Sequence, residues 1–149
     1  MVTKIISGGQ RGADIGGLLA AKELNILTGG TAPKGYRTEN GSDFDLRDIF
    51  NLSEHFSNKY PPRTAANVKN SDGTVLFGNM NSPGSTITIK FCQQMNKPYI
   101  INPSVNQLRQ WTNLNNIQIM NVAGNRESTN QGIQDRVKNH LIRTLNVQK

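Results

Sequence analysis

Hydrophobic residues along this chain form short continuous runs that alternate with helix-spaced stretches. Residues 3–7 and 73–78 are apolar or β-branched runs that end at glycine, which is typical of strands buried on both faces of a sheet. Residues 12–24 and 133–145 repeat their apolar positions at helical spacing. The pattern predicts a strand, a glycine-rich loop and a helix at the start of the chain, and a helix near its end.

The remaining segments complete an alternation of strands and helices. Residues 86–91 fit either a strand or a helix, and we predict a helix because the next strand needs a crossover if it is parallel to the one before. Residues 36–62 are polar and irregular, which indicates a functional loop or short helices. The other predictions are strands at 27–32, 98–102 and 117–122, a turn at 33–35, a brief helix at 64–69, and a helix capped by Ser104.

Strands that alternate with helices indicate an α/β fold. We therefore predict a Rossmann-like three-layer sandwich, with a mostly parallel sheet and helices on both faces. The length of 149 residues suits one ligand-binding domain that covers residues 1–149, and the sequence contains no internal repeat.

Composition narrows the choice of partner and compartment. The formal charge of +7 favours an anionic partner, but Lys and Arg are scattered, so nucleic acid is not the expected one. No apolar run is long enough for a membrane span, and the start lacks the features of a secretory signal. We expect a cytoplasmic protein, in the host cytoplasm if the abundance of asparagine reflects a viral origin. Cys92 is expected to be a small buried hydrophobe.

Glycine-rich turns follow several predicted strands, and in a parallel sheet such turns meet at one edge. Gly8, Gly9 and Gly12 follow the first strand, and Gly84 precedes the helix after the third. Glycine lets a backbone approach a phosphate closely, and the free N–H groups that open a helix favour negative charge. Nearby cations could bind the same anion, and those in loops are Arg11, Lys34, Arg37, Arg63 and Arg126.

Catalytic and metal-binding patterns are missing from the sequence. It contains neither the dinucleotide-binding G-x-G-x-x-G nor the P-loop motif, and it lacks G-x-S-x-G and H-E-x-x-H. Asp14, Asp72 and Glu127 could act as acids or bases, although Asp14 could equally orient the first loop by accepting backbone N–H bonds. We interpret His55 and His140 as structural, and the acidic cluster Glu39, Asp43, Asp45 and Asp48 as a solvated loop rather than a Mg²⁺ site. No metal is expected.

With these motifs in the same order, the chain resembles the molybdenum carrier family, a Rossmann-like branch related to the lysine-decarboxylase-like phosphoribohydrolases. The resemblance covers nearly the whole chain, and it rests on 6–14, 28–35, 63–68, 71–74, 84–86, 97–98 and 121–128. It implies a protein that binds molybdenum cofactor and forms homo-oligomers, dimers or tetramers. The chain has Arg11 where the family has Thr, and Asn125 where it has Pro. The glutamates of the phosphoribohydrolases are replaced by Ile87-Thr88-Ile89, which removes their expected acid or base.

These observations predict a non-catalytic carrier for an anionic, phosphate-bearing small molecule, either molybdenum cofactor or a nucleotide-derived ligand. One alternative is a viral sensor or sponge for a cyclic ADP-ribose-like nucleotide, and the other is a nucleotide or nucleoside hydrolase. The expected ligand-binding residues are Gly8, Gly9, Gln10, Arg11, Gly12, Asp14, Lys34, Gly35, Arg37, Arg63, Thr64, Asn67, Gly78, Gly84, Ser85, Thr86, Gly124, Arg126 and Glu127.

Overall fold

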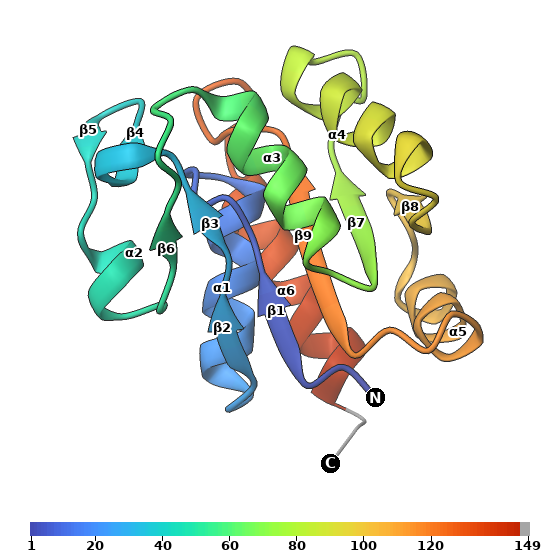
Figure 1. The fold of residues 1–149 in the computed structure, drawn as a ribbon. Helices are drawn as coiled ribbons and strands as arrows, with labels where there is room; N and C mark the ends of the chain where they lie inside the picture. The colour runs from blue at the N-terminus through green and yellow to red at the C-terminus, as the bar shows by residue number, and fades with distance from the viewer. Residues whose placement is uncertain (147–149) are drawn as a thin grey trace.

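A computed structural model, which describes residues 1–146, has a five-stranded parallel sheet at its centre (Figure 1). From one edge to the other the strands are β2 (Leu27–Gly29), β1 (Lys4–Ile6), β9 (Ile119–Gly124), β7 (Gly73–Phe77) and β8 (Tyr99–Ile101). Each neighbouring pair in this sheet is parallel. The sheet predicted from the alternation of strands and helices is confirmed.

Helices cover both faces of this sheet. The helices α1 (Ala13–Glu23), α5 (Val105–Leu114) and α6 (Ile133–Leu145) form one layer, in which α6 packs on both α1 and α5. The other layer consists of α3 (Tyr60–Lys69) and α4 (Pro83–Gln94), which contact each other and lie on the near side of the sheet in Figure 1. This is the predicted Rossmann-like three-layer sandwich. Within residues 1–146, no helix has the length and apolar character needed to cross a bilayer.

The polar region between the second strand and α3 forms a small lobe of short elements. Its two-stranded sheets are β3 with β6, which are parallel, and β4 with β5, which are antiparallel. The bounds of these elements are β3 Thr31–Ala32, η1 Lys34–Tyr36, β4 Arg37–Thr38, β5 Gly41–Ser42, α2 Asp45–Asp48 and β6 Ser53–Glu54.

The predicted strand at 117–122 is shifted by two residues to Ile119–Gly124, and two other predicted elements differ more from the structure. The strand expected at 27–32 breaks at Gly30, whose φ of 125° turns the chain out of the main sheet. A β-carbon at Gly30 would overlap the carbonyl oxygen of Ser7, so the chain passes too close to the end of β1 for any side chain. The helix expected to start at 64 begins four residues earlier, because Pro61 and Pro62 fit the first turn of a helix.

The layer of α1, α5 and α6 packs on the sheet through apolar side chains. Val75, Met120 and Val122 point to this side and belong to one buried cluster with Leu108 and Leu141. The first helix approaches the sheet very closely, because a β-carbon at Gly17 would lie 2.8 Å from that of Val122. Glycine at this position therefore fixes the distance between α1 and β9.

The layer of α3 and α4 meets a more polar side of the same strands. Thr74 and Asn121 lie side by side on β7 and β9, and the Asn121 side-chain N–H donates to the Thr74 hydroxyl over 3.2 Å. Thr64 on α3 and Thr88 on α4 are buried against this side. A hydrogen-bonded polar layer therefore lies directly beneath the ends of the strands, where a ligand would be expected.

Candidate functional site

The order of the strands places a crevice at the carboxyl ends of β1, β9 and β7. The crossover after β1 leads towards β2 and the crossover after β7 leads towards β8, so the two connections diverge on either side of β9. A cleft of about 470 Å³ occupies this position. Its walls come mainly from the loop after β1, the loop after β9, α3 and the start of α4. The lining residues are Gln10, Asp14, Glu39, Tyr60, Pro61, Arg63, Thr64, Ser82, Pro83, Gly84, Ile87, Thr88, Ala123, Gly124, Arg126 and Thr129.

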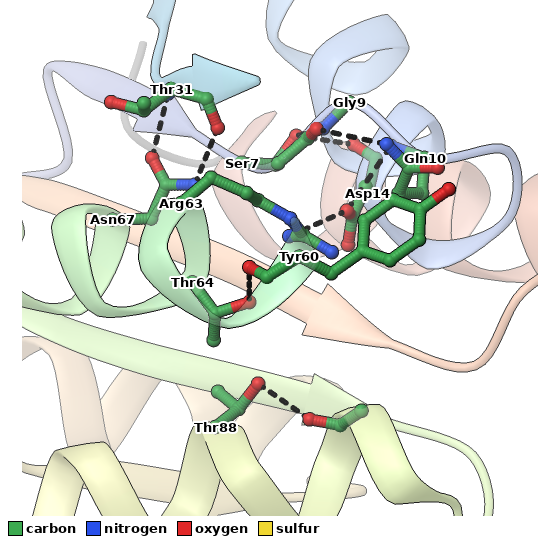
Figure 2. Close-up of polar contacts among 12 residues, drawn as sticks. Ser7, Gly9, Gln10, Asp14, Thr31, Tyr60, Arg63, Thr64, Asn67 and Thr88 are labelled. Atoms are coloured by element: carbon green, nitrogen blue, oxygen red, sulfur yellow. Dashed lines mark hydrogen bonds and ion pairs between the residues drawn. The ribbon is translucent and has the colours of Figure 1, made fainter. Parts of the chain in front are cut away.

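A buried ion pair between α3 and α1 forms the inner wall of the cleft. The guanidinium of Arg63 reaches from α3 to the carboxylate of Asp14, with Nη1 and Oδ2 separated by 3.6 Å (Figure 2). The side chains are only 14% and 8% exposed, so solvent screens the pair little. A β-carbon at Gly8 would overlap the Arg63 guanidinium. The space beside Gly8, where sequence analysis placed a phosphate, is therefore filled by Arg63.

Burial perturbs both members of this pair. It raises the pKa of Asp14 above its ordinary value, although Arg63 and the N–H of Gln10, which donates to Oδ2 over 3.2 Å, oppose that shift. Burial also lowers the pKa of Arg63, against the attraction of Asp14. The Arg63 Nε is buried without a hydrogen-bond partner among the described residues. The pair is thus costly to bury, which is typical of functional sites.

The ring of Tyr60 is surrounded by guanidinium groups. The central carbons of Arg126, Arg37 and Arg63 lie 4.5, 4.8 and 5.6 Å from the ring centroid, all within the range of cation–π attraction. Tyr60 and Arg63 are three residues apart on α3 and so share one face of the helix. Tyr60 therefore gathers arginines from three separate segments at one side of the cleft.

The rim of the cleft carries a second, more exposed ion pair. Arg126 Nη1 lies 3.6 Å from Glu39 Oε2, and both side chains are 33% exposed. The hydroxyl of Ser128 also donates to Glu39, over 2.9 Å to Oε2. Beyond this rim lies an open hollow that Arg11 and Glu127 line together with Glu39. An anion that entered the cleft would compete with Glu39 for the Arg126 guanidinium.

The first turn of α4 presents backbone donors at the opposite wall. The Ser82 hydroxyl caps the helix by accepting the Ser85 N–H, whereas the N–H of Gly84 has no partner among residues 1–146. No atom lies within 4 Å of the position that a β-carbon of Gly84 would take. Asn125 ties this turn to the β9 loop by donating to the Asn79 carbonyl over 2.9 Å. The turn can therefore accept an anion close to its backbone.

The carboxylates considered as catalytic groups have structural partners. Glu127 accepts the N–H groups of Gly132 and Gln134 over 2.6 and 3.0 Å at the start of α6, and these bonds lower its pKa. Asp72 accepts the N–H of Ile119 at the opposite end of the sheet. Asp14 holds the loop after β1 through the Gln10 N–H, as the alternative interpretation of this residue proposed.

The structure brings part of the expected site together. Of the residues expected from sequence, those that line the cleft are Gln10, Asp14, Arg63, Thr64, Gly84, Gly124 and Arg126. Gly8 and Asn67 line a small cavity beneath the cleft, and Arg11 and Glu127 line the hollow beside it. Arg37 contacts the outer side of Tyr60. The cleft walls do not include Gly9, Gly12, Lys34, Gly35, Gly78, Ser85 or Thr86.

Several lining residues were not expected from the sequence. Tyr60 lies in a region read as irregular, but Pro61 and Pro62 are a signal for a helix start that would have placed it beside Arg63. Thr88 lies four residues after Gly84 and therefore on the same face of α4. Ala123 and Thr129 carry no such signal.

Asn67 is committed to the fold rather than to the cleft. Its side-chain oxygen accepts the Thr31 N–H over 2.8 Å, and its side-chain N–H donates to the Thr31 carbonyl over 2.9 Å (Figure 2). These two bonds join α3 to β3. In the part of the chain that the structure describes, no group of three or more His, Cys, Asp or Glu side chains could hold a metal ion. Cys92 is buried on α4, where burial raises the pKa of its thiol.

Comparison with known proteins places this cleft in a family context. The family model described as the circularly permutated YpsA SLOG family matches residues 5–145. The crystal structure of a "putative molybdenum carrier protein" from Syntrophus aciditrophicus SB is similar, with a TM-score of 0.88 and 33% sequence identity. That similarity covers 97% of this chain and 95% of the other. Among the curated proteins, none matches the chain.

Proposed function

Because the chain belongs to the circularly permutated YpsA SLOG family, we propose that it is a carrier that encloses an anionic, phosphate-bearing small molecule in its cleft. The similar protein from Syntrophus aciditrophicus is described as a molybdenum carrier protein. Molybdenum cofactor and nucleotide-derived ligands both combine a phosphate with a nitrogen heterocycle, and the cleft offers groups for each part. It has guanidinium and backbone N–H donors, and it has an aromatic ring with apolar walls.

The observation that carries this proposal is the meeting of Arg126 with the first turn of α4 across one cleft. Within residues 1–146 the Gly84 N–H has no partner, and there is open space beside it. The start of a twelve-residue helix also favours negative charge. Arg126 contacts the Tyr60 ring and forms an ion pair with Glu39, and a phosphate can replace Glu39 in this partly exposed pair. These groups converge on one anionic group without any movement of the sheet.

Binding without chemistry is the role that the carboxylates support. A general acid or base needs to reach the reacting atoms. Asp14 is paired with Arg63 and fixes the first loop, and Glu127 caps α6. Both carboxylates hold the loops and helices around the site in place, so we assign the cleft to binding and transport.

The test measures binding of pyrophosphate, the smallest probe that presents the proposed anionic group. We expect Arg126→Ala to weaken pyrophosphate binding about tenfold to a hundredfold, since a charge-assisted hydrogen bond contributes about 1.5–3 kcal/mol. Titration calorimetry at fixed ionic strength measures this effect. The matched control is Arg143→Ala, which removes an arginine of α6 that lies outside the cleft. Equal affinities for wild-type protein and Arg126→Ala would contradict the proposed role of the cleft.

A further inference from the structure

A small cavity opens beneath the cleft, between the sheet and the layer of α3 and α4. Its volume is about 10 Å³, roughly the size of a single water-sized group. It shares several walls with the cleft above, and its own floor comes from β9. The complete lining is Gly8, Asp14, Arg63, Thr64, Asn67, Thr88, Asn121, Val122 and Ala123. One atom of a ligand in the cleft can therefore extend into this cavity, but a larger group cannot.

Two threonines face this cavity from α3 and α4, and each has already used its hydroxyl proton. Thr64 donates to the Tyr60 carbonyl over 3.0 Å, and Thr88 donates to the Gly84 carbonyl over 2.9 Å (Figure 2). A hydroxyl whose proton is engaged in this way has only lone pairs left. Towards the cavity, both side chains can therefore act only as hydrogen-bond acceptors.

The floor of the cavity adds a third acceptor. Asn121 is 2% exposed, and its side-chain N–H donates to the Thr74 hydroxyl. Its side-chain oxygen has no hydrogen-bond partner among residues 1–146. A buried acceptor that is left unpaired costs about 1–3 kcal/mol. Asn121 therefore brings an acceptor without a partner among residues 1–146 to the wall of a cavity that adjoins the binding cleft, where a ligand that fills the cleft would bury it.

Most side-chain donors around the cavity are engaged elsewhere, but the Arg63 Nε–H is buried without a partner among the described residues. Both functional groups of Asn67 bind the backbone of Thr31. The Arg63 guanidinium is paired with the Asp14 carboxylate. Three acceptors thus outnumber the unpaired Nε–H of Arg63 around a space of one atom. A group that donates hydrogen bonds is therefore the one that completes most of them.

We infer that this cavity selects a ligand whose head carries an amino or hydroxyl group, which enters the space between Thr64, Thr88 and Asn121. The inference rests on the proposed function, because the phosphate end of the same ligand binds at Arg126 and α4. The expected ligands are therefore phosphate esters that carry a primary amino or free hydroxyl group on the ring system at the end opposite the phosphate. A ligand with only a hydrogen at that position leaves the acceptors unpaired. A ligand with an alkylated amine there is too large for the cavity.

The test compares probes that differ by one amino group. The pairs are AMP with purine riboside 5′-monophosphate, and GMP with IMP, each titrated into wild-type protein by calorimetry. In at least one pair, we expect the member with the amino group to bind about tenfold more tightly or better, which corresponds to one buried acceptor left unpaired. Thr88→Val keeps the shape of the side chain and removes the acceptor, so it should abolish most of this difference. Thr88→Val also removes the bond to the Gly84 carbonyl at the anionic end, but this loss affects both members of a pair equally and cancels in their difference.

The matched control is Thr112→Val, because Thr112 makes the same hydroxyl-to-carbonyl bond on α5, in the opposite layer. This control should retain the full difference within each pair. If neither pair differs in wild-type protein, or if Thr88→Val retains the difference, the inference is wrong while the proposed function stands. If pyrophosphate and all four nucleotides fail to bind, the proposed function is wrong and the inference falls with it.

Discussion

The two faces of the central sheet differ in chemistry, although the same strands build both. The face under α1, α5 and α6 packs through aliphatic side chains such as Val75 and Val122. The face under α3 and α4 carries Thr74 and Asn121, and beyond the ends of the strands Arg63 of α3 reaches the Asp14 carboxylate at the start of α1. One layer therefore supplies most of the apolar burial that stabilises the fold, and the other supplies the polar groups of the cleft.

This division follows from the geometry of a strand. Successive side chains point to opposite faces, so Met120 and Val122 enter the apolar layer while Asn121 between them enters the polar one. A single strand can thus carry core and site in alternate residues. Substitutions on the two faces should consequently separate stability from binding.

The largest effect on stability is expected from the buried pair on the polar face. Asp14→Asn leaves the Arg63 guanidinium buried without its counter-charge, and breaking such a pair costs about 3–5 kcal/mol. Urea unfolding measures the loss. Combining Asp14→Asn with Arg63→Met removes both charges at similar volume, and we expect this variant to recover most of the lost stability. Unchanged urea midpoints for Asp14→Asn would show that the pair does not hold the polar face together.

A substitution on the apolar face should lower the stability of the fold by a similar or somewhat smaller amount, but it should not change ligand binding. Leu141 on α6 is fully buried in the cluster that joins this layer to the sheet. Leu141→Ala should cost about 2–5 kcal/mol through lost burial and the cavity that remains. Under conditions where the variant is folded, its pyrophosphate affinity should equal that of wild type. A weakened affinity would mean that the two faces are not independent.

The apolar face was also the part that the sequence predicted best. Helical spacing located α6, and buried runs located β1 and β7, because these elements follow one repeating pattern. The polar face was harder, since its helix α3 begins at Tyr60 inside a stretch without apolar periodicity. The break at Gly30 depends on a contact with Ser7, which lies far away in sequence. Such contacts have no local signal.

The candidate site shows the same limit. Glycine turns correctly indicated the end of the sheet where a cleft exists, because topology alone places that end. Which turn is open was not predictable. Arg63 fills the space beside Gly8, whereas Gly84 remains free, and only the tertiary packing of α3 distinguishes them. Lys34 and Gly35 follow a short strand that lies outside the main sheet, so they do not reach the cleft.

The smallest effect is expected where a charge supports the apolar layer, and pH should reveal it. The Glu127 carboxylate accepts the N–H groups of Gly132 and Gln134 at the start of α6, and these bonds lower its pKa below the ordinary value of 4.5. Because the pKa is lower in the folded state, the carboxylate stabilises the fold above that ordinary value and loses this contribution as pH falls through the lowered pKa. Glu127→Ala should therefore reduce the melting temperature at neutral pH, and the difference from wild type should shrink in acid. Glu127→Gln retains an acceptor without the charge, so its smaller deficit should vary less with pH. A deficit that stays constant for Glu127→Ala from neutral to acidic pH would show that the cap acts through shape alone, and that the apolar layer owes nothing to this charge.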